Sequence, residues 1–138
     1  MKDKKGKSFV AIMVTIALLA LFLRVVSERI IKITNSQNES NARTTLKLIS
    51  IALENYARDN HGIYPSSISI LSQAKPDFLD RDYVGQSPIK GYSYSCPRLN
   101  ESGYNCYARP LRCNLTGKIT YSVTTGSLLV SEECDRKE

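Results

Sequence analysis

A long apolar run near the N-terminus dominates the pattern of apolar and polar positions. The sixteen residues Ser8–Leu23 carry no charge, several lysines precede them, and Arg24 follows them. At about 1.5 Å per residue, a helix that continues to Val26 is about 28 Å long, close to the roughly 30 Å hydrocarbon core of a bilayer. The pattern predicts a membrane-inserted helix over residues 7–26, with Arg24 extending its charge toward the far interface.

Two other interpretations of this run stay open. A cleaved secretory signal shares the basic start and the apolar run, but Ala17-Leu-Leu-Ala20 does not have the small-x-small form of a cleavage site. A core helix of a soluble protein carries a polar stripe, which this run lacks. A lipoprotein is excluded, because no cysteine precedes Cys96. We therefore expect an anchor that stays, with the lysines of residues 1–6 in the cytoplasm and the rest of the chain outside.

After the anchor, the helical pattern changes twice. The helical pattern continues with charges to Thr34, and residues 35–45 then lose nearly all apolar residues and are poor in helix formers. Residues 27–45 are therefore expected to be a polar, solvated stalk, or a place where the helix can loosen. Residues 46–60 regain apolar positions spaced by three and four, which predicts a helix with one buried face. Gly62 then suits a left-handed C-terminal cap. One helix is expected from the membrane to Asn60, its last part packed on a globular domain of residues 46–138.

Shorter patterns fill the rest of this domain. Ser66 or Ser67 is placed to cap a short helix that carries Ile68 and Leu71. Three segments are expected to be antiparallel strands, residues 91–96, 104–108 and 118–124. A turn at residues 125–127 then leads from the third segment into residues 128–130. The expected fold class is α+β, a long helix on a small antiparallel sheet.

Charge excludes one class of function. The formal net charge is +6, but four lysines against Asp3 within residues 1–7 account for +3 of it. The exported part is only mildly basic, and it has no basic run interleaved with aromatic residues. Nucleic-acid binding is therefore not expected.

The four cysteines all lie in the last third of the chain, beyond the membrane. An even number in a small exported domain indicates disulfides, whereas a zinc site would need CxxC pairs or nearby histidines that the sequence lacks. Four cysteines allow three pairings. Strand register favours Cys96 with Cys106, because it also pairs Tyr94 with Ala108 and Ser95 with Tyr107. That choice leaves Cys113 with Cys134.

The order of these pieces resembles the type IV pilin and type II secretion pseudopilin family. Gly6 precedes the apolar helix, where the family's prepilin peptidase cuts. The run Ser8-Phe-Val-Ala-Ile-Met-Val-Thr-Ile-Ala-Leu-Leu looks like the family's mature start, FTLIELLVVIAII. The passage from Leu53 to Leu71 is similar to the "DNGxYPT…L" passage of major pseudopilins. The resemblance is good from Lys4 to about Leu71 and covers the rest only in outline.

The resemblance implies a lollipop-shaped subunit that assembles through its N-terminal helix. Residues 1–6 would be a leader, cut between Gly6 and Lys7, and residues 7–26 would become the filament core. Implied partners are other pilin or pseudopilin subunits, the prepilin peptidase, an inner-membrane assembly platform and the lipid bilayer. We assign membrane retention and assembly to an apolar set of five residues: Phe9, Ile12, Ile16, Leu19 and Leu23.

The sequence departs from the family at three points. The family's fifth mature residue is a glutamate thought to pair with a neighbouring subunit's N-terminal amine, and Ala11 stands there. Such a loss resembles minor subunits at a filament tip. Lys7 stands where the family usually has phenylalanine. The family's acidic, glycine-rich calcium loop is also missing, and the second disulfide is expected to hold that region instead.

No constellation points to catalysis, a metal or a cofactor. His61 lies beside Gly62 at a helix end, where a capping or surface role is expected. Asp77, Asp80 and Asp82 lack the glycine and closing glutamate of an EF-hand, so a solvated loop is expected there. We expect a non-enzymatic structural subunit of a pseudopilus or type IV pilus-like filament in a bacterial inner membrane. The alternative is a single-pass anchored extracytoplasmic binding domain that does not polymerise.

Overall fold

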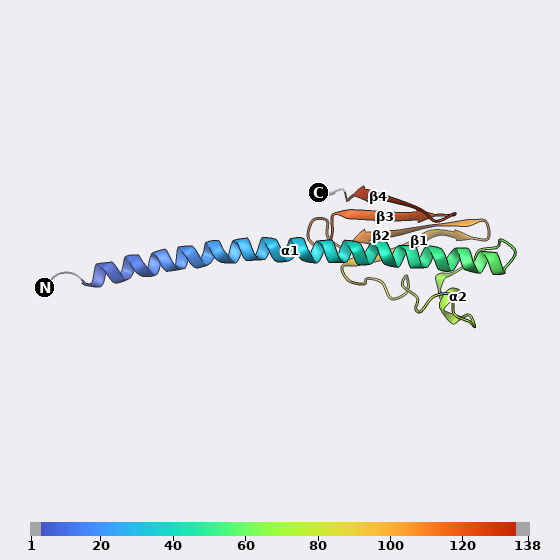
Figure 1. Ribbon diagram of the computed structural model, residues 1–138, viewed down its shortest axis with the longest axis horizontal. Coiled ribbons are helices and arrows are strands. Elements are labelled where there is room, and N and C mark those ends of the chain that lie inside the picture. The colour runs from blue at the N-terminus through green and yellow to red at the C-terminus, as the bar shows by residue number, and fades with distance from the viewer. Residues whose placement is uncertain (1–3, 135–138) are drawn as a thin grey trace. The chain divides into compact units, whose positions relative to one another are not determined.

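The computed structural model describes the backbone of residues 4–134 and the side chains from Ser8 to Cys134. In that part of the chain, two helices precede a four-stranded sheet (Figure 1). Contacts divide the chain into two units, Met1–Ile33 and Thr34–Glu138. The elements are α1 (Lys4–Asp59), α2 (Ile68–Gln73), β1 (Tyr92–Asn100), β2 (Gly103–Pro110), β3 (Ile119–Thr124) and β4 (Leu128–Glu133).

The sheet is an antiparallel meander with the order β1-β2-β3-β4. Tyr94 lies opposite Ala108 and Ser95 opposite Tyr107, which is the register predicted from the sequence. The register of β1 against β2 shifts between Ser95 and Arg98, and β1 continues past Pro97 to Asn100. The α+β class with an antiparallel sheet is therefore confirmed.

The core of the globular unit lies between one face of α1 and one face of the sheet. Leu46, Ile49 and Leu53 are fully buried on the helix, at the spacing that the sequence predicts. Alternate strand residues meet them from the sheet, since successive strand side chains point to opposite faces. The sheet contributes Tyr92, Tyr94, Tyr104, Cys106, Ala108, Tyr121 and Val123. Leu71 of α2 completes this core.

The globular unit begins earlier than the boundary predicted at residue 46. Residues 34–45 were expected to belong to a solvated stalk, but Ala42 is fully buried and Asn35 is 4% exposed. The Asn35 amide donates to the carbonyl of Asn114 (3.1 Å), and that of Asn38 donates to the carbonyl of Thr116 (2.9 Å). The segment packs on the globular unit although it has no apolar stripe, because these amides bond to loop carbonyls in place of water.

Both predicted helix caps are present. α1 ends at Asp59, one residue before the predicted end, and Gly62 has a φ of +86°. The Gly62 N–H donates to the carbonyl of Ala57 (2.7 Å), which satisfies one of the last helix carbonyls. At α2, the Ser67 hydroxyl accepts from the Ser69 N–H (3.2 Å). The two caps fix where the chain leaves α1 and re-enters a helix.

Two disulfides brace the sheet, Cys96–Cys106 and Cys113–Cys134. This is the pairing that the strand register favours, and it leaves no thiolate for the zinc alternative. The second disulfide spans 21 residues of sequence and joins the end of β4 to the loop before β3. That loop carries the carbonyls of Asn114 and Thr116, so the disulfide also holds the acceptors used by α1.

Candidate functional site

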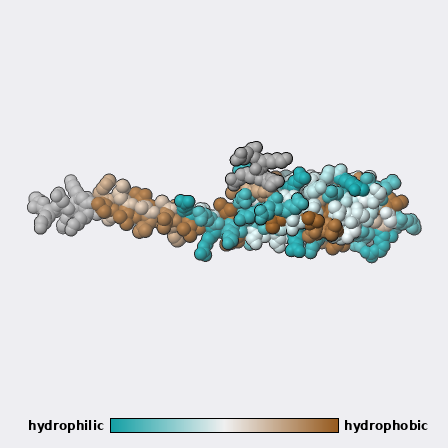
Figure 2. Space-filling view, turned by 90° about the horizontal axis from the view of Figure 1, so that it is seen from above, coloured by the Kyte–Doolittle hydropathy of each residue, from teal (hydrophilic) through white to brown (hydrophobic). Residues whose placement is uncertain are grey.

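The first unit presents an apolar helix surface that nothing within the described chain covers. Every large apolar side chain from Phe9 to Leu23 is between 52% and 66% exposed, on all sides of α1. Figure 2 shows this stretch as a nearly continuous hydrophobic surface. A helix that is apolar all round is normally buried in protein or lipid. Its surface therefore requires a partner outside the chain.

Polar groups within and just after this surface are bonded to the helix itself. The Thr15 hydroxyl donates to the carbonyl of Ala11 (2.8 Å), and that of Ser27 donates to the carbonyl of Arg24 (2.8 Å). Arg24 and Glu28 form an exposed ion pair across one helical turn, with 3.6 Å between nitrogen and oxygen. The helix is long and apolar enough to cross a membrane.

The predicted assembly residues all lie on this surface. Phe9, Ile12, Ile16, Leu19 and Leu23 are separated by three or four residues, so they share one face of α1. This spacing is that of a helix that packs along another helix. The predicted processing residues Gly6 and Lys7 lie in the first turns of α1, and their side chains are outside the described part. Residues 1–3 of the predicted leader also lie outside it.

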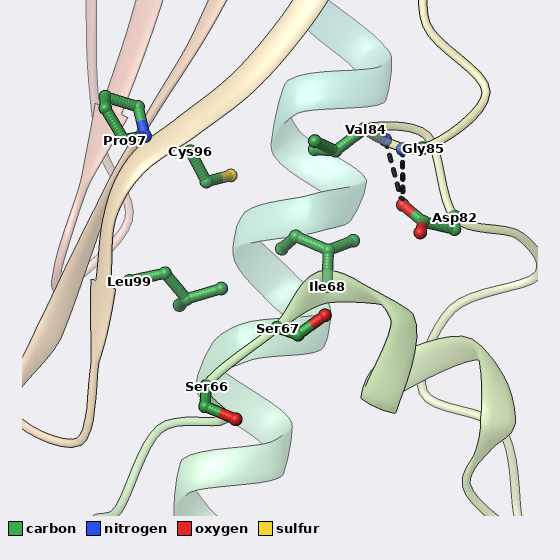
Figure 3. Close-up of a pocket in the computed structure, with 9 residues that line it drawn as sticks. All are labelled: Ser66, Ser67, Ile68, Asp82, Val84, Gly85, Cys96, Pro97 and Leu99. Carbon is green, nitrogen blue, oxygen red and sulfur yellow. Dashed lines mark hydrogen bonds between the residues drawn. The ribbon is translucent and has the colours of Figure 1, made fainter.

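The globular unit has a cavity of about 330 Å³ (Figure 3). Its walls come from the start of α2, the loop at residues 82–85 and the middle of β1. Its polar wall includes the Asp82 carboxylate, whose Oδ1 accepts from the N–H groups of Val84 (3.1 Å) and Gly85 (2.8 Å). The lining residues are Ser66, Ser67, Ile68, Asp82, Val84, Gly85, Cys96, Pro97 and Leu99. Cys96 is held in a disulfide, and the Asp82 carboxylate is the ionisable side chain of this lining.

A second, smaller cavity of about 130 Å³ is lined in part by Tyr83 of the loop before β1 and by Tyr94 of β1. The Arg81 guanidinium lies 5.6 Å from the ring centre of Tyr83, and Asp80 accepts from the Tyr83 hydroxyl (2.8 Å). The Tyr83 hydrogen bond and the adjacent guanidinium lower the pKa of the Asp80 carboxyl. Asp82 is committed to the turn described above. Asp80 and Asp82 are thus engaged in local bonds, and no group of three metal-ligating side chains gathers within the described residues.

A carboxylate at the far end of α1 joins the helix to the sheet. Glu54 accepts from the hydroxyls of Tyr64 (3.0 Å) and Tyr104 (2.8 Å) and from the N–H of Gly126 (2.7 Å). Burial, aided by the hydrogen bond to Glu54, raises the pKa of Tyr64 to about 12. No local pattern in the sequence indicates this cluster, because its members are far apart along the chain. Its bonds are all satisfied internally, so we assign it a structural role.

His61 lies apart from both cavities. It occupies the turn after α1, with a φ of 58°, next to Gly62. In the described part of the chain, α1 from Phe9 to Leu23 holds the longest run of exposed large apolar side chains.

Comparison with known proteins gives no relative: no family model, no curated protein and no solved structure matches this chain.

Proposed function

We propose that this chain is a structural, non-enzymatic subunit of a type IV pilus-like filament or type II secretion pseudopilus. Residues 7–26 would hold it in the bacterial inner membrane, with the N-terminus in the cytoplasm and the globular unit outside. The observation that carries this proposal is the apolar surface from Phe9 to Leu23, exposed on a helix that continues into the globular unit. Further support comes from the motif resemblance around Gly6 and from Leu53 to Leu71.

Assembly would exchange lipid contacts for protein contacts. In a bilayer, the apolar side chains of α1 face lipid tails. In a filament, the face formed by Phe9, Ile12, Ile16, Leu19 and Leu23 would pack on the same run of neighbouring subunits. Packing between apolar helices in a membrane depends on close van der Waals contact rather than on expulsion of water. The prepilin peptidase and the inner-membrane assembly platform are the partners that this route requires.

Ala11 favours a position at the filament tip. A glutamate at this depth would be costly unless it were paired with a neighbouring subunit's amine. With Ala11 the chain neither bears that cost nor offers that pairing group to a subunit ahead of it. A tip subunit has no subunit ahead, so it loses nothing by the change.

A second function is a single-pass anchored binding domain that does not polymerise. The cavity of about 330 Å³ beside Cys96 supports it, since its lining mixes hydroxyl, carboxylate and apolar groups suited to a small polar ligand. In this case α1 would remain in lipid and its first residues would not be processed.

The mature N-terminus separates the two functions. We expect mass spectrometry of the native protein to give a chain that starts at Lys7, with an N-methylated amine. Replacing Gly6 with leucine should leave a longer precursor in the membrane fraction. A chain that keeps Met1 would favour the anchored domain, and a start near Ser27 would reject both proposals.

A further inference from the structure

A short basic segment of α1, residues 24–33, follows the apolar surface. It comes directly after the uncharged run, and the globular unit begins at the next residue, Thr34. Figure 2 shows hydrophilic side chains where the hydrophobic stretch ends. Three basic residues and one acidic residue give the segment a formal charge of +2, and they are Arg24, Glu28, Arg29 and Lys32.

Two of the basic side chains are not paired by the described chain. Arg24 and Glu28 form an ion pair across one helical turn (3.6 Å). Arg29 and Lys32 are exposed, and neither forms an ion pair within the described residues. They are three residues apart, so they lie on the same side of α1. This side presents two cations to its surroundings.

The basic segment also has an apolar side. Ile30 and Ile33 are 58% and 60% exposed. Ile30 lies about five turns beyond Ile12, so it continues the face that carries the predicted assembly residues. Arg29 and Lys32 project from another side, since successive residues of a helix are about 100° apart. The segment is thus amphipathic, which is the pattern of a helix at a membrane surface.

Depth in the membrane identifies what the basic side meets. The predicted membrane helix ends at Val26, near the limit of the hydrocarbon core. Residues 27–33 add about 10 Å to it, and the headgroup layer is about 5–7 Å thick on each side of a bilayer. Helix side chains lean toward the N-terminus, here toward the bilayer, and those of arginine and lysine are long enough to reach back into this layer. The anions in it are lipid phosphates.

We propose that the basic side of this segment binds anionic phospholipid headgroups at the outer surface of the membrane. The Arg29 guanidinium and the Lys32 ammonium would donate hydrogen bonds to lipid phosphate oxygens, while Ile30 stays on the assembly side of the helix. The proposal rests on the membrane insertion that both proposed functions share. Because the two sides differ, the lipid contact would hold a subunit in the membrane without blocking its helix–helix packing.

Lipid retention by the full chain tests the proposal. The protein is placed in nanodiscs with equal amounts of phosphatidylglycerol, which is anionic, and phosphatidylcholine, which is zwitterionic, with the same acyl chains. Native mass spectrometry then counts the lipids of each kind that stay bound after release from the disc. We expect wild type to retain phosphatidylglycerol in at least about threefold excess, and the double variant Arg29→Gln with Lys32→Gln to lose at least about half of that excess.

The matched control is the double variant Arg43→Gln with Lys47→Gln. It removes the same two charges from exposed positions of the same helix, in the globular unit, and glutamine is as good a helix former. The control should retain phosphatidylglycerol as wild type does. An equal loss in both double variants would make net charge the cause, and no loss in either would assign the preference to the lysines near the N-terminus. Either result would overturn the proposal.

Amide hydrogen exchange locates the contact. Bound headgroups hinder local opening of the helix, so residues 27–33 should exchange more slowly in nanodiscs with phosphatidylglycerol than in phosphatidylcholine alone. Residues 35–45 should exchange alike in both. Exchange over residues 27–33 that is the same in both lipids would reject the lipid contact alone. A chain that does not stay in either nanodisc would contradict membrane insertion itself, and with it both proposed functions.

Discussion

Two stretches of α1 have the same secondary structure, but the rest of the chain covers only one of them. From Phe9 to Leu23 the helix is apolar on all sides and more than half exposed, whereas from Ala42 to Ala57 it buries one apolar stripe against the sheet. The second stretch is stabilised by its own chain. The first needs apolar surroundings that its own chain does not supply, because exposed apolar area of that extent is unfavourable in water. One helix thus serves two environments.

The largest expected effect comes from truncating a buried residue of the second stretch. Leu53 is fully buried, so Leu53→Ala should lower the free energy of unfolding of the globular unit by about 2–5 kcal/mol. The matched control is Leu19→Ala in the exposed stretch, which should leave the free energy of unfolding of the globular unit unchanged. Urea unfolding of the full chain in micelles, followed by tyrosine fluorescence, measures both. Equal losses would contradict the division of α1 into two environments.

Removing the second disulfide should have the next largest effect. Replacing Cys113 and Cys134 with serine frees a loop that spans 21 residues, and the expected loss is about 3 kcal/mol. The loop also holds the acceptors for Asn35 and Asn38, so amide hydrogen exchange should accelerate over residues 34–45. Exchange there that stays as slow as in wild type would show that the disulfide does not support the docking of α1.

The side-chain amide of Asn38, in the polar segment 34–45, should contribute less to the unfolding free energy than the second disulfide does. Asn38→Ala removes the hydrogen bond to the Thr116 carbonyl and should cost about 1 kcal/mol. Ser36→Ala is the control. Ser36 is exposed, and its replacement by alanine raises the helix propensity by about as much as the replacement of Asn38 does. The difference between the two unfolding free energies isolates the hydrogen bond. No difference would mean that residues 34–45 behave as the solvated stalk predicted from the sequence.

The smallest effect concerns alkaline pH. The ordinary pKa of tyrosine is 10.0, and burial raises that of Tyr64 to about 12. Because the unfolded chain then loses the proton first, the stabilisation is complete below pH 10 and is lost as the pH rises toward 12. Unfolding at a series of pH values should show this fall, and Tyr64→Phe should reduce it. A fall of the same size in the variant would assign it to the other buried tyrosines, Tyr92, Tyr94, Tyr104 and Tyr121, whose pKa values are also raised.

Features with a local or periodic origin could be predicted from the sequence. The stripe through Leu46 and Leu53 marked the buried face of α1, Gly62 marked its end, and the alternation around Tyr94 gave the register of β1 with β2. Each depends on spacing along the chain, which the sequence displays directly.

Features that depend on contacts between distant residues could not be predicted. Asn35 and Asn38 look like stalk residues until the loop at Asn114 and Thr116 is placed beside them. The cavity beside Cys96 and the bonds of Glu54 join segments that no local pattern links. The place of β4 at the edge of the sheet also follows from the strand order and not from the strand's own residues.

The central claim is that the face of α1 with Leu19 contacts other subunits. It is tested most directly by placing a photo-cross-linking amino acid at Leu19 in the native cell, with exposed Asp59 as the control position. We expect Leu19 to cross-link to the apolar N-terminal helix of another pilin-like protein or of a second copy, and Asp59 not to do so. Cross-links from Leu19 to lipid alone, under conditions in which filaments assemble, would contradict the account.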